Sequence, residues 1–191
     1  MHAGGVEGFD AKTGKSLWSV PWKTPYDASA VTPTVNGSTV FISSAYGTGA
    51  LALSVDGTGA KELWKKDKTA KEKFASSYAD PIILDGYLYG YSGGDRDGEF
   101  KCLELKTGTE KWASKTLGYG ACVYADGYLI CLSTGGDLFL VAAKPEAFTK
   151  VAEFKGAVPG KPFPVWTAPV IANDKLYLRF QKQLICYDLR N

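Results

Sequence analysis

Three tryptophans at nearly equal spacing constrain this chain most. Trp18, Trp64 and Trp112 lie 46 and 48 residues apart, and each one ends a phrase that contains a Thr-Gly pair. The glycines of these pairs are Gly14, Gly59 and Gly108. A phrase that recurs at this period indicates a repeat architecture, in which one supersecondary unit is copied and stacked. We therefore expect the most prominent residues of the chain to be structural.

A second series of short turns alternates with the tryptophan phrases. These turns are Asn36-Gly37, Asp85-Gly86, Asp126-Gly127 and Asn173-Asp174. Such pairs tolerate the positive φ that both central positions of a type I′ hairpin require, and the flanking residues alternate as in β-strands. Pro33, Pro81 and Pro169 precede three of the turns. Because proline in a sheet is confined to strand starts, edges or bulges, we place each at the start of a strand.

Each repeat then holds four short strands, which we name A to D in chain order. Four antiparallel strands in about 45 residues have the size of one β-propeller blade. The predicted fold is all-β: one domain that forms a propeller segment of four four-stranded antiparallel blades, incomplete relative to a parent with seven or eight blades. We expect a partial blade at 6–20, blades at about 28–66, 76–115 and 119–154, and a partial blade at 165–191. In the last complete blade, Val151 aligns with the tryptophans.

The two ends of the chain resemble the same strand. Gly8-Phe9-Asp10 and Cys186-Tyr187-Asp188 both fit strand C, four repeats apart. In a closed four-bladed ring these two segments would compete for one position. We therefore expect either a piece of a larger propeller or a half-ring that self-associates with another copy.

Composition excludes several classes of protein. The chain has 191 residues, 45% of them apolar and 13% aromatic, which is enough for a packed core. The net charge is +2 and the lysines are scattered, so no basic stripe indicates nucleic-acid binding. No run approaches the ~20 apolar residues of a membrane span, so no direct membrane span is expected. The first residues show no signal-peptide pattern.

Reactive groups are scarce. The single histidine is His2, close to the N-terminus, and no phosphate-binding loop or nucleophile elbow is present. Gly93 to Glu99 carries several oxygen ligands at a spacing weakly similar to that of a calcium loop, but a polar turn explains it better. We therefore predict no catalytic, cofactor-binding or metal-binding residues, and no cofactor.

Two of the four cysteines should lie opposite each other. Cys122 and Cys131 are equidistant from the Asp126-Gly127 turn, so a two-residue hairpin pairs them at a non-hydrogen-bonded position, where side chains are close. They form either a cross-strand disulfide, in an oxidising compartment, or two small buried thiols. Cys102 and Cys186 occupy equivalent C strands two blades apart and are too distant to bond within one chain.

The long and varied loops join strands D to A and B to C, which places them on one face of the sheets. Function tends to reside in such loops on a rigid scaffold. Five aromatic residues fall in or beside them: Trp22, Tyr26, Phe74, Phe163 and Trp166. Two alternatives remain open, namely that these side chains anchor a binding partner or that they cap the blade cores.

Residues Asp10 through Trp18 and Pro81 through Tyr89 resemble the pyrroloquinoline-quinone-like (PQQ-like) propeller repeat, also found in BamB-like proteins. The resemblance implies that the glycine-tryptophan elements dock neighbouring blades, namely Trp18, Trp64 and Trp112 with Gly14, Gly59 and Gly108. It also implies a periplasmic or otherwise extracytoplasmic parent protein. Two functions are typical of the repeat. One is a non-catalytic scaffold that binds protein or peptide partners, as in outer-membrane assembly. The alternative is a fragment of a PQQ-dependent quinoprotein dehydrogenase.

The dehydrogenases resemble one another in a disulfide between adjacent cysteines over the cofactor, an aspartate base and a calcium site. No adjacent cysteine pair occurs in this sequence. That difference favours the scaffold over the enzyme.

Overall fold

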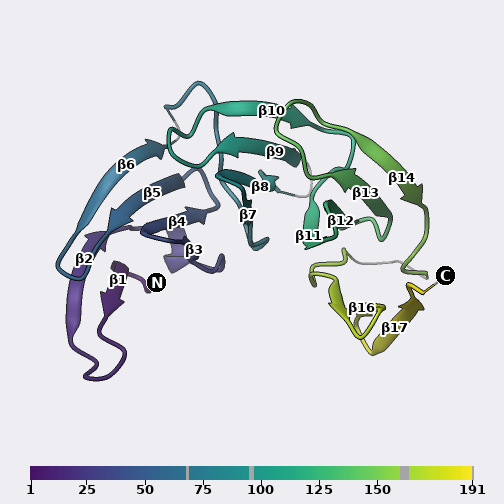
Figure 1. The fold of residues 1–191 in the computed structure, drawn as a ribbon, viewed down its shortest axis with the longest axis horizontal. Helices are drawn as coiled ribbons and strands as arrows, with labels where there is room; N and C mark the ends of the chain where they lie inside the picture. The colour runs from purple at the N-terminus through teal and green to yellow at the C-terminus, as the bar shows by residue number, and fades with distance from the viewer. Residues whose placement is uncertain (68, 95–96, 160–163, 191) are drawn as a thin grey trace.

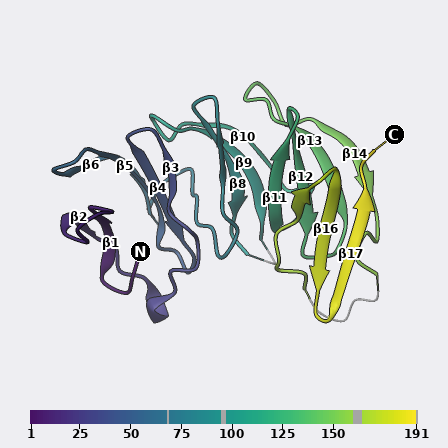
Figure 2. The ribbon, with the colours of Figure 1, turned by 60° about the horizontal axis from the view of Figure 1, so that its bottom comes forward.

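The sheets of this protein follow one another along an open arc, with β1 and β2 at one end and β16 and β17 at the other (Figure 1). The computed structural model describes residues 1–67, 69–94, 97–159 and 164–190. Turned by 60°, the arc shows its sheets standing side by side (Figure 2). Apart from one 3₁₀ turn at Pro25–Asp27, all regular elements of the described residues are strands. The predicted fold class, an unclosed all-β propeller segment, is confirmed.

Three sheets are complete, and each is a meander of four antiparallel strands. Sheet 1 consists of β3 (Thr34–Asn36), β4 (Thr39–Ser44), β5 (Gly49–Val55) and β6 (Ala60–Lys66). Sheet 2 consists of β7 (Ile82–Leu84), β8 (Tyr87–Ser92), β9 (Glu99–Glu104) and β10 (Glu110–Ser114). Sheet 3 consists of β11 (Gly120–Ala125), β12 (Tyr128–Ser133), β13 (Leu138–Ala142) and β14 (Lys150–Phe154).

Two partial sheets flank the complete ones. The N-terminal sheet pairs β1 (Gly5–Phe9) with β2 (Ser16–Pro21). The C-terminal sheet contains β15 (Val170–Ala172), β16 (Lys175–Phe180) and β17 (Gln183–Asp188). The turn between β1 and β2 has the same hydrogen bond as the turn between strands C and D of sheet 2. In the first turn the Asp10 amide donates to the Lys15 carbonyl, and in the second the Glu104 amide donates to the Thr109 carbonyl. The N-terminal sheet therefore supplies strands C and D, whereas the C-terminal sheet supplies strands A, B and C.

Three of the four expected hairpins have the predicted turns. Their central pairs take positive φ at both positions: Asp85-Gly86, Asp126-Gly127 and Asn173-Asp174. The first hairpin differs, because Asn36 pairs with Thr39 and the turn is Gly37-Ser38 rather than Asn36-Gly37. Only Gly37 takes a positive φ there, and glycine at the first central position is typical of a type II′ turn.

A β-bulge in strand D sets the position of each tryptophan. In sheet 2 the pairing skips Lys111, so that Trp112 lies opposite Cys102. Trp18 and Trp64 follow the same kind of bulge in β2 and β6. In sheet 3 the bulged residue is Val151, and Ala152 lies opposite Leu140. The alignment of Val151 with the tryptophans is therefore wrong by one residue, because the loop before β14 is longer than its counterparts.

Trp64 connects sheet 1 to sheet 2. Its indole Nε1 donates a 2.7 Å hydrogen bond to the carbonyl of Leu105, which lies just after β9. The ring covers Gly108, where a Cβ atom would stand 2.6 Å from the indole. Trp112 connects sheets 2 and 3 in the same way, through a 2.9 Å hydrogen bond to the Lys144 carbonyl. These contacts support the interpretation of the indoles as docking residues.

The other residues of the tryptophan phrases differ from this pattern. Trp18 packs over Gly8 of its own sheet and against the cluster shared with sheet 1. Gly14 takes a positive φ of 68°, but a Cβ there would meet nothing within 4 Å. Gly59 also has open space around it, and its φ is not positive. Its turn is held by the Asp56 carboxylate, which accepts the Gly59 amide at 2.8 Å. Among the three glycines, Gly108 alone supports an indole.

Apolar clusters fill each gap between adjacent sheets. Phe41 and Ala52 of sheet 1 meet Leu88 and Leu103 of sheet 2. Further clusters lie between sheets 2 and 3, between sheet 3 and the C-terminal sheet, and between the N-terminal sheet and sheet 1. The two central strands of each complete sheet are therefore largely buried.

We predict that Gly108→Ala destabilises the protein by roughly 2–4 kcal/mol, because the methyl group adds overpacking against Trp64 to the left-handed backbone strain. The matched variant Gly14→Ala carries the backbone strain alone and should cost about 1 kcal/mol. Urea unfolding followed by tryptophan fluorescence measures both. Equal losses in the two variants would contradict the docking role of Gly108.

Candidate functional site

The loops that join strands D to A and B to C border a groove of about 880 Å³. Its walls come from loops of sheets 1 and 2 and from the segment before β15. Representative lining residues are Ala30, Ala45, Tyr46, Tyr78, Gly93 and Trp166. The lining combines small residues with aromatic rings, which leaves space in which a flat or extended ligand can lie.

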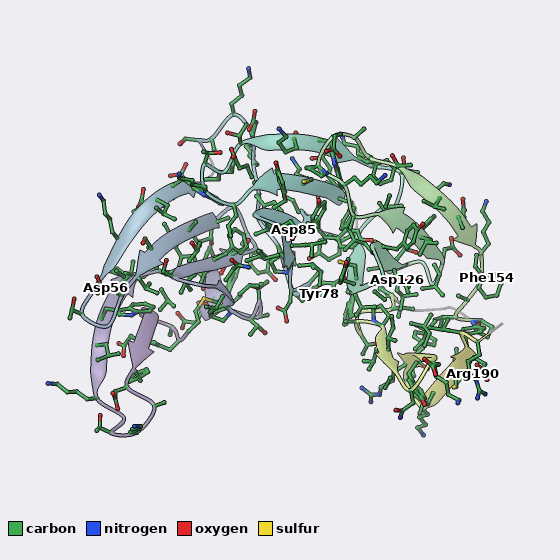
Figure 3. The ribbon with its side chains drawn as sticks, in the orientation of Figure 1. Asp56, Tyr78, Asp85, Asp126, Phe154 and Arg190 are labelled. Carbon is green, nitrogen blue, oxygen red and sulfur yellow. The ribbon has the colours of Figure 1, made fainter. Side chains whose placement is uncertain are left out.

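Exposed aromatic side chains stand along the groove. The side chain of Tyr46 is 66% exposed and that of Trp166 is 60% exposed. Tyr78, which projects toward the inner side of the arc (Figure 3), approaches Trp166 with ring centroids 6.1 Å apart. Trp166 also borders a second hollow of about 300 Å³. Large apolar rings that remain in solvent at a concave surface are typical of binding sites.

Two of the tyrosines near the groove have unfavourable backbone conformations. Tyr26 has φ of 59° and Tyr46 has φ of 55°, in the left-handed region that bulky residues avoid. Their rings meet edge to face, with centroids 5.5 Å apart, and both are exposed. Strain of this kind concentrates at functional sites, where the surrounding structure imposes it.

Hydrogen bonds hold the middle loop of the groove in place. The Tyr119 hydroxyl, just before β11, accepts the amide of Ser77 at 2.9 Å and that of Tyr78 at 3.3 Å. On the opposite side, the hydroxyl of Ser43 in β4 accepts the amide of Ser76 at 2.8 Å. The loop that carries Tyr78 is therefore tied to sheets 1 and 3, so the groove has a preformed wall.

Charged groups at the groove neutralise one another in part. The ammonium group of Lys101 lies 2.9 Å from a carboxylate oxygen of both Glu99 and Glu110. Burial lowers the pKa of Lys101, but its hydrogen bonds to these carboxylates outweigh that effect and raise the pKa above its ordinary value. Lys101 therefore remains charged at neutral pH. Lys115 adds a longer ion pair to Glu99 at 3.7 Å, while Lys73 lines the groove as an exposed cation.

In the candidate calcium segment from Gly93 to Glu99, the Asp97 carboxylate accepts the Gly94 amide at 3.0 Å. Residues 95 and 96 of this segment lie outside the described residues. Across the part of the chain that the structure describes, no group of three or more histidine, cysteine, aspartate or glutamate side chains is arranged to hold a metal ion.

The four aromatic candidates that the structure describes divide into two kinds. Trp22 and Phe74 are buried, so for them the core-capping alternative holds and a role as exposed anchors is wrong. Trp22 donates a 3.0 Å hydrogen bond to the Ser44 hydroxyl, and Phe74 packs edge to face on Phe41. Tyr26 and Trp166 are exposed.

The prediction for Phe163 lies outside the described residues. Sequence reasoning missed Tyr46 and Tyr78 as lining residues of the groove. The signal for Tyr46 is an aromatic residue in the short loop between strands B and C of sheet 1, whereas the prediction covers the longer loops.

The structure places Cys122 and Cys131 directly opposite each other, as the hairpin register requires, and records them as free thiols. Both are buried in the cluster between sheets 2 and 3. Burial raises the pKa of the Cys131 thiol, and it raises that of Cys102 to about 11. Neither thiol therefore forms the reactive thiolate readily in the folded protein. Cys186 is free and exposed.

Together, the meandering four-stranded sheets, the docked indoles and the groove on the loop face define an open β-propeller segment. The family model of outer membrane protein assembly factor BamB matches residues 2–191, and the chain belongs to this family.

Solved structures agree with this assignment at the level of the fold. BamB from Moraxella catarrhalis matches with a TM-score of 0.67 and 17% identity, over 96% of this chain and 51% of that one. The computationally designed Ika8 protein matches with a TM-score of 0.65 and 13% identity, over 92% of this chain and 49% of that one. The chain thus spans about half the length of these structures. A search of curated protein sequences finds no match. No helix among the described residues is long and apolar enough to cross a membrane.

The cysteine pair leads to a prediction. Refolding in oxidised glutathione should join Cys122 to Cys131, because the glutathione disulfide accepts the two electrons and the unfolded chain exposes both thiols. The bond closes a ten-residue loop and should stabilise the protein by roughly 2–3 kcal/mol. Mass spectrometry would show the loss of two hydrogen atoms, and peptide mapping would locate the bond. The same oxidant added to the folded protein should react slowly. Four free thiols after oxidative refolding would contradict the prediction.

Proposed function

We propose that this chain is part of a non-catalytic propeller scaffold that binds protein or peptide partners, similar to BamB-type outer-membrane assembly proteins. The observation that carries the proposal is the groove with its exposed rings of Tyr46 and Trp166. Aromatic anchors beside a concave, largely apolar surface are the usual centres of protein recognition. Family membership supports a periplasmic or otherwise extracytoplasmic location for the parent protein.

The shape of the groove favours an extended peptide segment. Gly47 lines the groove and has open space where a Cβ atom would stand, which allows a partner's backbone to approach closely. The rings of Tyr46, Tyr78 and Trp166 provide stacking surfaces for the partner's apolar side chains. Lys73 and Lys115 at the rim can pair with acidic groups of the partner.

We predict that Trp166→Ala weakens the binding of a groove ligand roughly 30-fold, the usual loss at an aromatic hot spot. The probe is a peptide selected from a random phage-displayed library against the immobilised 191-residue chain. Its affinity is measured by fluorescence anisotropy. The matched control is Phe154→Ala, which removes a ring that is 51% exposed on β14, outside the groove. The control should change the affinity less than about 2-fold.

Two outcomes would count against the scaffold. Selected peptides that bind Trp166→Ala and Tyr46→Ala as tightly as the unaltered chain would show that the groove is not the binding site. Titration with PQQ and Ca²⁺ tests the alternative, a fragment of a PQQ-dependent quinoprotein dehydrogenase. We expect no stoichiometric shift in the quinone absorbance, and such a shift would favour the enzyme.

A further inference from the structure

The groove on the loop face carries pairs of inclined aromatic rings. Tyr78 and Trp166 have ring centroids 6.1 Å apart, and their planes are inclined by 59°. Tyr46, which also lines the groove, meets Tyr26 at 5.5 Å with an interplanar angle of 77°. Two inclined rings form an apolar corner, which is the kind of surface on which the pyrrolidine rings of proline-rich segments dock.

In the part of the chain that the structure describes, no open strand edge lines the groove. The strand residues of its lining are Ser92 of β8 and Glu99 and Lys101 of β9, and both strands are paired on each side. Just after β8, the Gly93 amide donates to the Ala75 carbonyl at 2.9 Å, which closes this edge as well. A partner therefore cannot dock here by adding a β-strand, because that mode needs a free row of amides and carbonyls.

Donors on the rings remain available to a partner's backbone. The Tyr46 hydroxyl and the Trp166 indole Nε1 make no hydrogen bond with any described residue, and both side chains are exposed. A polyproline II helix has no internal hydrogen bonds, so its carbonyl groups face outward and accept such donors. An α-helix uses its carbonyls internally and offers mainly side chains. The unpaired donors therefore favour a partner in the polyproline II form.

The uncompensated charge at the groove is positive. Lys73 borders the groove, is exposed and makes no ion pair with a described residue. Lys115 has only the 3.7 Å pair with Glu99, whose carboxylate also lies 2.9 Å from Lys101. The Asp97 carboxylate is engaged by a backbone amide of its own loop. Acidic residues at one end of a bound segment would therefore complement Lys73 and Lys115.

We propose that the groove binds a proline-rich segment in the polyproline II conformation, with acidic residues at one end. This inference rests on the proposed function and names the class of partner for the same groove. The proline rings pack against Tyr46, Tyr78 and Trp166, and the acidic end pairs with Lys73. The Tyr119 hydroxyl fixes the loop of Tyr78, and a polyproline II segment is stiff before it binds, so the complex forms at a small cost in conformational entropy.

Fluorescence anisotropy with synthetic peptides tests the proposal on the 191-residue chain. The probe is a fluorescein-labelled peptide of about eight prolines, roughly 25 Å long, followed by a pair of glutamates. A control peptide with alternating glycine and serine keeps the charge but lacks the rings and the preformed helix, and we expect it to bind at least about 10-fold more weakly. A peptide of alternating valine and threonine, which suits strand addition, should bind no better than that control. Binding of either control as tight as that of the proline probe would overturn the proposal.

Reversal of charge separates recognition from a loss of folding. Lys73→Glu should weaken binding of the glutamate-ended probe about 5-fold and strengthen binding of a proline probe that ends in lysines. Misfolding cannot produce such a reversal. The matched control Lys106→Glu alters an exposed lysine in the turn between strands C and D of sheet 2, on the opposite face, and should change neither affinity. If Lys73→Glu keeps the peptide preference of the unaltered chain, the acidic end of the partner is refuted.

A smaller change tests the backbone contact. Tyr46→Phe keeps the ring and removes only the hydroxyl donor, so the proline probe should bind about 3-fold more weakly. The matched control Tyr124→Phe removes a hydroxyl from β11, beside the Asp126-Gly127 turn on the opposite face, and should leave the affinity unchanged. Equal affinities of Tyr46→Phe and the unaltered chain would contradict the contact between this donor and a partner carbonyl.

Peptides selected from the phage-displayed library distinguish this inference from the proposed function. Proline-rich selected peptides that compete with the proline probe would support both. Selected peptides that depend on Trp166 but contain no proline-rich stretch, together with no binding of the proline probe, would leave the scaffold standing and refute the polyproline II partner.

Discussion

Burial of both faces of every sheet is the requirement on which this structure depends. Sheet 2 shows it well: Leu103 and Leu88 pack toward sheet 1, whereas Phe100 and Trp112 pack toward sheet 3. A sheet that is apolar on both sides cannot remain folded alone, so its stability resides in the interfaces with its neighbours. The arc follows from stacking such sheets with their fourth strands, β6, β10 and β14, on its outer side (Figure 1).

Within these interfaces, the indoles bury apolar area and also fix how adjacent sheets are placed relative to each other. The bulge in strand D brings Trp64 forward so that its Nε1 reaches a carbonyl of the next sheet. A buried donor without a partner is costly, so this hydrogen bond favours one relative placement of the two sheets. Sheet 3 carries Ala152 at the equivalent position and joins its neighbour through apolar contacts, among them Val158 and Leu178.

A rigid stack leaves its loops available for recognition. Tyr46 and Trp166 come from loops more than one hundred residues apart, yet they line one groove because successive sheets place these loops on the same face. The scaffold also holds Tyr26 and Tyr46 in strained backbone conformations. At the ends of the arc the stacking requirement is unmet, which accounts for the exposure of Leu184 and Val35.

Local patterns in the sequence determined the fold class, three of the four hairpin turns and the opposition of Cys122 and Cys131, because turn residues and two-residue periodicity act between near neighbours. Only the tertiary structure decided which aromatic residues are exposed. Trp22 and Phe74 are buried and Trp166 is not, although all three lie in similar loops. The tertiary structure also brought together the distant loops that line the groove. Burial depends on which distant sheets meet, and no local pattern contains that information.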